Sequence, residues 1–249
     1  MSNSFRLDQI YTLLLHKERL TVEELAQTFK VTPTTIRRDL LVLEERNLIH
    51  RTRGAVMLSQ DPRRTTNFLL DEKKRIAAAA SRFLSDTMSV ILDSGTTVAA
   101  FVDYILESNN FDKINFITHS PQTALRVSAK YAVSLPSGCL MPQSDYIVSY
   151  DVENFYRSVN VDLAVLSSTG VYDCPGLTIS FPLQLNVKKS AAECANKRIA
   201  LLDSSKYFRR GIYVFCDFQD IDTLVTVETE ENKPQLDRIS KLGTDIILA

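Results

Sequence analysis

Apolar residues in the first sixty positions recur at helical spacing in three consecutive segments. The first segment predicts a helix with a single apolar face made of Leu7, Ile10, Leu13 and Leu14. The second predicts a short helix that buries Val22, Leu25, Ala26 and Phe29. The third has apolar residues at i, i+4 and i+7, which form one stripe of Ile36, Leu40 and Leu43. Three short helices therefore open the chain.

The last two of these helices have recognisable start signals. Thr21-Val22-Glu23-Glu24 is a capping box, in which Thr21 and Glu24 each satisfy a free amide of the other. Thr32 is a suitable N-cap for the third helix, and Pro33 suits its first position because no amide hydrogen is needed there. Only a short connection separates the two helices, and this spacing predicts a helix-turn-helix.

The third helix has a polar side suited to DNA. Hydroxyls and guanidiniums can contact phosphate oxygens and guanine edges in the major groove. An amphipathic helix in water has the same pattern, so the interpretation depends on the elements that flank it. The residues that we expect to contact DNA are Thr32, Thr34, Thr35, Arg37 and Arg38.

After Arg46 the spacing changes from helical to extended. Two short strands around Gly54 predict a β-wing, whose Arg51 and Arg53 we expect to contact DNA. Residues 1–58 would then form a winged helix-turn-helix domain. It has nine Lys or Arg against seven Asp or Glu, a charge of +2. This excess is too small to indicate DNA binding without the motif.

A polar linker is expected at residues 59–67, and from residue 68 the pattern becomes that of an α/β domain. Short apolar strands alternate with helices, which predicts a mainly parallel sheet covered on both faces. The expected strands are 88–92, 114–118, 131–135, 163–166, 199–202, 213–216, 224–227 and 245–248. The expected helices include 98–106, 124–129, 183–194 and 235–242.

Polar residues follow several of these strands directly. In parallel sheets, ligands bind at the carboxyl ends of the strands, so such loops are expected to lie together. Asp93-Ser94-Gly95-Thr96-Thr97 offers a glycine, hydroxyls and a helix start, as a phosphate site requires. Other strand ends contribute His119 and Ser120, Gly138, and the segment from Asp203 to Lys206. Each could also be an ordinary capped turn, and Lys206 could be a surface lysine.

Composition excludes several other classes. The four cysteines lie far apart without Cys-x-x-Cys spacing, and the three histidines are dispersed, so we expect neither a metal site nor a cofactor. No segment has the length and apolarity of a membrane span or the pattern of a signal peptide. These features are typical of a cytoplasmic protein without membrane association.

Both halves of the chain resemble the DeoR family of bacterial transcriptional regulators. That family has a Val-Ser-x-x-Thr-Ile-Arg-Arg-Asp-Leu segment, and this chain has the same pattern from Val31 to Leu40 with Thr32 in place of serine. The family's effector domain, related in fold to ribose-5-phosphate isomerase, has Asp-x-Gly-Thr-Thr and Asp-x-Ser-Lys motifs. Asp93 to Thr97 and Asp203 to Lys206 match these two motifs. Glu72-Lys73 with Ile76-Ala77 also agrees with the family pattern, at the domain entrance.

The resemblance implies a repressor of a carbohydrate-metabolism operon, whose affinity for a double-stranded operator is controlled by a phosphorylated sugar. It implies a homo-oligomer, dimer or tetramer, and no enzymatic activity. The effector site would comprise Asp93, Ser94, Gly95, Thr96, Thr97, His119, Ser120, Gly138, Lys188, Asp203 and Lys206.

Four departures from the family pattern alter the wall of this pocket: His119 replaces an asparagine, Ser137 a glycine, Gln184 a glutamate, and Ser149 or Tyr150 a further glycine. The alternatives are therefore a DNA-binding regulator with a ligand-blind oligomerisation domain, or a sugar-phosphate isomerase-like enzyme.

Overall fold

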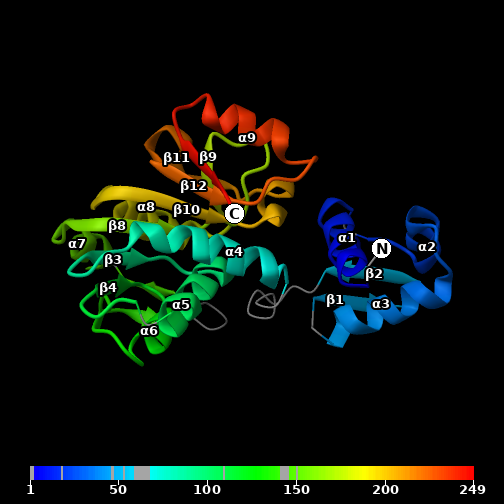
Figure 1. The fold of residues 1–249 in the computed structure, drawn as a ribbon, viewed down its shortest axis with the longest axis horizontal. Coiled ribbons are helices and arrows are strands. Elements are labelled where there is room, and N and C mark those ends of the chain that lie inside the picture. Colours follow the sequence, from blue (N-terminus) through cyan, green and yellow to red (C-terminus); the bar gives the residue numbers. More distant parts are fainter. Residues whose placement is uncertain are drawn as a thin grey trace. The chain divides into compact units, whose positions relative to one another are not determined.

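The computed structural model describes residues 3–17, 19–45, 48–52, 54–58, 68–108, 110–140, 146–149 and 151–249. Internal contacts divide the chain into two compact units, Met1–Leu70 and Asp71–Ala249 (Figure 1). The linker expected at residues 59–67 lies outside the described residues.

The N-terminal unit contains three helices followed by a hairpin. The helices are α1 (Asn3–His16), α2 (Val22–Phe29) and α3 (Pro33–Glu45), and the strands are β1 (Ile49–Thr52) and β2 (Ala55–Leu58). The two strands pair antiparallel, with Thr52 opposite Ala55. Gly54, in the turn between them, has φ +81°, a value that glycine adopts without strain. The three predicted helices and the wing hairpin are confirmed.

Local start signals and a small apolar core hold this unit together. The capping box forms as predicted, with the Glu24 amide donating to Thr21 Oγ1 at 3.1 Å and the Thr21 amide to Glu24 Oε2 at 2.7 Å. The core includes fully buried residues from all three helices, namely Ile10, Leu25, Ile36 and Leu40. Phe68 and Leu69 also pack in this core, and the Phe68 ring centroid lies 3.7 Å from that of Tyr11.

The C-terminal unit is built on a seven-stranded parallel sheet in the order β13-β12-β10-β8-β3-β4-β5. The strands are β3 (Ser89–Leu92), β4 (Asn115–Thr118), β5 (Val133–Ser134), β8 (Val161–Leu166), β10 (Ala195–Leu202), β12 (Thr223–Thr226) and β13 (Asp245–Leu248). The helices are α4 (Leu70–Ala80), α5 (Thr96–Ser108), α6 (Pro121–Val127), α7 (Asp151–Arg157), α8 (Leu185–Glu193) and α9 (Lys233–Ser240). The expected parallel α/β fold is confirmed.

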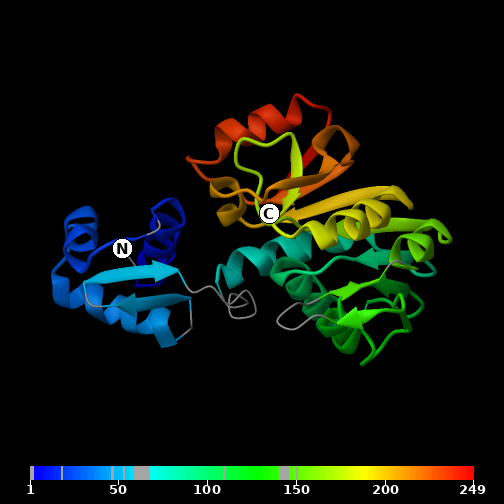
Figure 2. The ribbon, with the colours of Figure 1, turned by 180° about the vertical axis from the view of Figure 1, so that it is seen from behind.

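Alternate side chains of the central strands enter two separate cores. Leu163 and Val165 of β8 pack with α4, α5 and α6, whereas Ala164 and Leu166 pack with α7, α8 and α9. Figures 1 and 2, which view the sheet from opposite sides, show α5 and α8 on its different faces. Burial on both faces explains why these strands are continuously apolar in the sequence.

One strand prediction was wrong in its placement. Residues 213–216 form β11 (Tyr213–Asp217), but β11 lies outside the parallel sheet and pairs antiparallel with β9 (Gly176–Ile179), a strand that was not predicted. The backbones approach closely here, because a Cβ on Gly176 would lie 2.1 Å from the Cys216 carbonyl oxygen. Helix α7 and the short hairpin of β6 (Cys139–Leu140) and β7 (Ile147–Val148) were not predicted.

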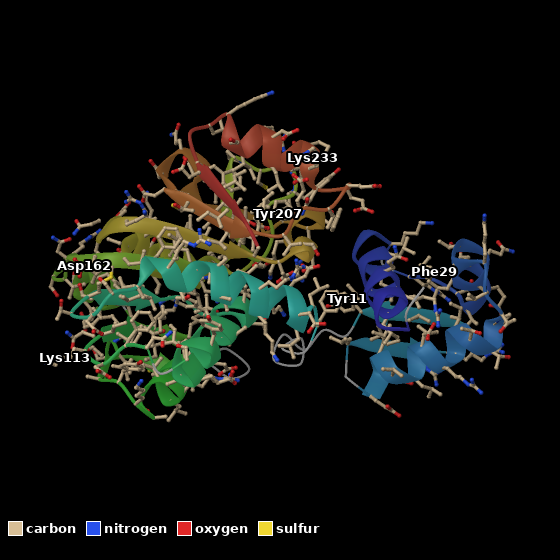
Figure 3. The ribbon with its side chains drawn as sticks, viewed as in Figure 1. Tyr11, Phe29, Lys113, Asp162, Tyr207 and Lys233 are labelled. Carbon is tan, nitrogen blue, oxygen red and sulfur yellow. The ribbon has the colours of Figure 1, made fainter. Side chains whose placement is uncertain are left out.

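A hydrogen-bonded chain inside the C-terminal unit gives a test of this packing. The fully buried Tyr207 (Figure 3) donates to Thr226 Oγ1 at 2.9 Å, and Thr226 donates in turn to the Leu202 carbonyl at 2.7 Å. Tyr207→Phe leaves the Thr226 donation intact and should cost about 1 kcal/mol of unfolding free energy. Thr226→Val leaves the buried Tyr207 hydroxyl without its acceptor and should cost about 2–3 kcal/mol of unfolding free energy.

Urea unfolding followed by circular dichroism measures both costs. Equal costs for the two variants would contradict the donor order inferred for this chain of hydrogen bonds. The double variant removes both polar groups together, so its cost should be less than the sum of the two.

Candidate functional site

Helix α3 presents one exposed stripe and one buried stripe. Thr34, Arg37 and Arg38 are exposed at i, i+3 and i+4, and Leu41 continues the stripe with 46% of its surface exposed. Ile36, Leu40 and Leu43 are buried on the opposite side. The structure therefore places three of the expected DNA contacts on one accessible face.

The other two hydroxyls expected at DNA serve the start of the helix. The Thr35 amide donates to Thr32 Oγ1 at 3.3 Å, so Thr32 is the N-cap that the sequence predicts. The two hydroxyl oxygens lie 3.0 Å apart, and Thr35 is half-buried. Thr32 and Thr35 thus fix where α3 begins.

Acidic side chains lie beside two of the arginines. Arg51 Nε lies 2.7 Å from Glu44 Oε2, which ties the wing to the end of α3. Arg37 Nη2 lies 4.0 Å from Glu23 Oε1 in an exposed pair that contributes little to stability. Arg53 lies outside the described residues.

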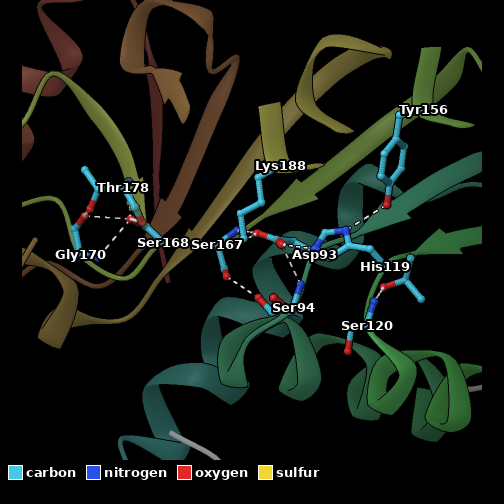
Figure 4. Close-up of polar contacts among 11 residues, drawn as sticks. Asp93, Ser94, His119, Ser120, Tyr156, Ser167, Ser168, Gly170, Thr178 and Lys188 are labelled. Atoms are coloured by element: carbon cyan, nitrogen blue, oxygen red, sulfur yellow. Dashed lines mark hydrogen bonds and ion pairs between the residues drawn. The ribbon is translucent and has the colours of Figure 1, made fainter. Parts of the chain in front are cut away.

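In the C-terminal unit, the Asp93 carboxylate at the end of β3 is enclosed by donors from several elements (Figure 4). Oδ1 accepts from the Ser94 amide at 2.8 Å and lies 3.2 Å from His119 Nε2. Oδ2 accepts from the Ser167 amide at 2.9 Å and from Lys188 Nζ at 2.8 Å. Burial opposes ionisation of Asp93, but Lys188 and His119 outweigh it and hold its pKa well below the usual range.

His119 joins Asp93 to a buried tyrosine. His119 Nδ1 lies 2.9 Å from the Tyr156 hydroxyl, and both side chains are almost completely buried. An ionised carboxylate only accepts, so the nitrogen facing Asp93 bears a proton. Burial raises the pKa of Tyr156 well above its usual value, so the phenol stays protonated and can donate to Nδ1. His119 therefore fills the position between Asp93 and α7.

A second buried carboxylate, Asp203, caps the short helix η4 (Ser204–Phe208) at the end of β10. It accepts from Thr97 Oγ1 at 3.1 Å and from the amide and hydroxyl of Ser205 at 3.2 and 2.5 Å. Burial opposes its ionisation, but Lys206 and Lys73 lower the pKa of Asp203 to about 2. The Thr97 bond links this cluster to the start of α5.

Four cations and three acids are concentrated around these strand ends. The cations are Lys73, Lys188, Lys206 and Arg209, and the acids are Glu72, Asp93 and Asp203. Burial and the charge of Arg209 lower the pKa of Lys206 to about 7, although Asp203 acts in the opposite direction. Burial likewise lowers the pKa of Lys73. An added anion would stabilise the charged forms of these lysines.

The loop before α5 is shaped for close approach to its backbone. Gly95 has φ +130°, and a Cβ there would lie 2.7 Å from Ser167 Oγ. Ser94, Gly95 and Thr96 are at least partly accessible, whereas Thr97 is buried. The first amides of a helix have no intrahelical acceptor, so the start of α5 can receive an anion.

The remaining expected site residues have different positions. Ser120 is buried and caps α6, accepting from the Thr123 amide at 3.1 Å. Gly138 is exposed ahead of β6, and no hydrogen bond in the described chain links it to Asp93 or Asp203. The structure thus brings together the Asp93 loop, His119, Lys188, Asp203 and Lys206, but gives Ser120 a capping role.

Four neighbours of this site were not among the predicted site residues: Lys73, Tyr156, Ser167 and Arg209. Lys73 had a detectable signal, because it precedes Ile76, Ala77 and Ala80 at i+3, i+4 and i+7, on the buried stripe of α4. A lysine on an apolar stripe requires a nearby acid. The other three had no local signal.

Within the described part of the chain, no cluster of three or more His, Cys, Asp or Glu side chains could hold a metal ion. No helix among the same residues combines the length and apolarity needed to span a membrane.

Each unit matches the model of a known domain family. The model of the DeoR-like helix-turn-helix domain matches residues 6–61, and that of the DeoR C-terminal sensor domain matches residues 69–228. Full-length relatives include the HTH-type transcriptional repressor GlcR of Bacillus subtilis, 29% identical over 98% of this chain and 95% of that protein. The glycerol-3-phosphate regulon repressor of Haemophilus influenzae is 26% identical over 93% of this chain and 92% of its own length.

Solved structures similar to this chain include a D-ribose-5-phosphate isomerase in complex with phospho-erythronic acid. It covers 54% of this chain and 52% of its own, at 22% identity and a TM-score of 0.40. The sensor-domain match alone spans more than half of the sequence, and the helix-turn-helix match precedes it. The chain therefore belongs to the DeoR family of transcriptional regulators.

Proposed function

We propose that the protein is a repressor that binds an operator through α3 and the wing, and that a phosphorylated sugar or closely related metabolite controls this binding. The observation that carries the proposal is the exposed stripe of Thr34, Arg37 and Arg38 on a capped helix-turn-helix, in a chain that also has a sensor domain. Helices that read the major groove present such residues near their N-termini.

The charges at the strand ends support an anionic effector. The formal charges of the four cations exceed those of the three acids by one, and the start of α5 adds amide donors. Lys206 and Gly95 would contact the phosphate. Three relatives are named as glycerol-3-phosphate regulon repressors, which is consistent with an effector in this chemical class.

We further propose a homo-oligomer, dimer or tetramer. Paired recognition helices would contact repeated half-sites, as in other helix-turn-helix proteins. Effector binding would favour an arrangement of the N-terminal units that no longer matches the operator.

A second candidate function is a regulator with a ligand-blind C-terminal domain. The hydrogen bonds that the Asp93 carboxylate already accepts favour it. Oδ2 already accepts from two donors and Oδ1 from one, with His119 Nε2 3.2 Å away, so little acceptor capacity is left there for a sugar hydroxyl. The accessible donors near Lys206 favour a ligand that is recognised mainly by its anionic group.

Isomerase-like catalysis has less support. A general base must reach a substrate proton and have a pKa near the working pH. Asp93 already accepts from Ser94, Ser167 and Lys188 and has a pKa held far below that range, and Asp203 has a pKa of about 2. Both carboxylates are suited to holding the site's cations rather than to accepting a proton.

Removing either exposed arginine of α3 should weaken DNA binding. We expect Arg37→Ala and Arg38→Ala each to cost about 1–3 kcal/mol of binding free energy, because a guanidinium contact to a base or phosphate is lost. Fluorescence anisotropy with a duplex selected by the wild-type protein from a randomised library would measure this. Arg210→Ala removes an exposed arginine from the C-terminal unit and should leave affinity unchanged. Unchanged affinity in both α3 variants would refute the assigned DNA face.

A phosphorylated effector should raise the melting temperature of the wild-type protein, and its free sugar should not. A ligand at about 100 times its dissociation constant stabilises the folded state by roughly 2.7 kcal/mol. Lys206→Gln should abolish the shift, while Lys113→Gln, which changes an exposed lysine ahead of β4 (Figure 3), should preserve it. No shift across a broad panel of sugar phosphates would favour the ligand-blind domain.

Anion binding at Lys206 should also depend on pH. Its pKa is lowered from 10.5 to about 7 in the folded protein, so Lys206 is charged below that pH and mostly neutral above it. Sulfate remains a dianion throughout this range and should therefore stabilise the protein more at pH 6 than at pH 8.5. Calorimetric melts should show this difference in the wild type and lose it in Lys206→Gln. An equal stabilisation at both pH values in the wild type would contradict the role of Lys206.

A further inference from the structure

The DNA-binding unit contains a buried ion pair between its first and third helices. Asp39, on α3, is only 2% exposed, and Arg6, on α1, is 13% exposed. Arg6 Nε donates to Asp39 Oδ2 at 2.5 Å and Nη2 donates to Oδ1 at 3.1 Å. Two parallel bonds of this kind hold a carboxylate and a guanidinium in one relative orientation.

The location of Asp39 on α3 gives this pair its significance. Asp39 directly follows Arg37 and Arg38, yet it points to the buried side of the helix, beside Ile36 and Leu40. Apolar contacts are not directional and tolerate small rotations of a helix. The two parallel hydrogen bonds from the planar guanidinium of Arg6 tolerate much less rotation, because both bonds lengthen when the helix turns about its axis.

We propose that Arg6 and Asp39 are positioning residues, which fix the rotation of α3 so that Thr34, Arg37 and Arg38 face the major groove in the correct register. The inference rests on the proposed DNA-binding function and adds residues that do not themselves contact DNA. Base recognition depends on donor positions within a fraction of an ångström, so a small rotation of α3 reduces selectivity before it reduces phosphate contacts.

A purely stabilising role for the pair predicts a different result. Replacing a buried ion pair by apolar residues of similar volume is often neutral or favourable for stability, because the cost of desolvating two charges disappears. Arg6→Met/Asp39→Leu should therefore retain the fold while it removes the directional contact. If the pair only stabilises the unit, this variant should keep normal DNA selectivity.

The experiment compares selectivity in proteins shown to be folded by circular dichroism. The wild-type protein first selects a duplex from a randomised library. Anisotropy then gives the affinity of each variant for that duplex and for a scrambled duplex of the same composition, at one salt concentration. We expect Arg6→Met/Asp39→Leu to lower the ratio of the two affinities by about tenfold or more, mainly through weaker binding to the selected duplex.

A second variant keeps the positive charge at residue 6 but removes the paired hydrogen bonds. Arg6→Lys preserves the ion pair with a single ammonium, which cannot make two parallel bonds, and should also lower the selectivity ratio. The control is Arg126→Lys in the C-terminal unit, where Arg126 Nη1 donates to both oxygens of Asp103 at 2.8 Å. This control should leave the ratio unchanged.

Retention of the wild-type ratio in folded Arg6→Met/Asp39→Leu would overturn the positioning role. If that variant does not fold, Arg6→Lys decides the matter, and an unchanged ratio in Arg6→Lys overturns the role equally. Failure of the wild type itself to select any duplex would instead overturn the proposed DNA-binding function, so the two failures are distinguishable.

Discussion

The buried carboxylate of Asp93 connects several elements of the C-terminal unit. It follows the central strand β3 and accepts hydrogen bonds from its own loop, from the loop after β8 and from Lys188 on α8, with His119 beside it after β4. A buried charge with fewer partners would cost several kcal/mol, so the positions of these elements depend on one another. These partners occupy two acceptor positions of Oδ2 and one of Oδ1.

The two halves of the site have different electrostatic states. Around Asp93, one lysine and one imidazole face one carboxylate, and the charges are closely paired. Around Asp203, burial works against the charges of Lys73 and Lys206, and Arg209 adds further repulsion. An anion placed among these partly buried cations would lower the free energy of their charged forms.

Elements with strong local signals were predicted well. The helical spacing of Ile36, Leu40 and Leu43, together with the cap at Thr32, identified α3 and its exposed side. Strand β13 has the predicted bounds of residues 245–248. The short strands β6, β7 and β9 were missed, since a few residues give too little periodicity to separate a strand from a loop. Strand β11 was predicted as a strand but assigned to the wrong sheet, because the local pattern contains no information about pairing partners.

Periodicity, helix caps and strand-end glycines are local properties, so the helix-turn-helix, the parallel α/β domain and the loops at the strand ends could be predicted from the residues alone. The pairing of donors with acceptors, by contrast, became known from the folded structure. Lys188 and Asp93 are 95 residues apart, and Arg6 and Asp39 are 33 apart. Such pairs depend on the crossing of helices and the order of strands, and a partner for a buried charge is chosen by position in space rather than by distance along the chain.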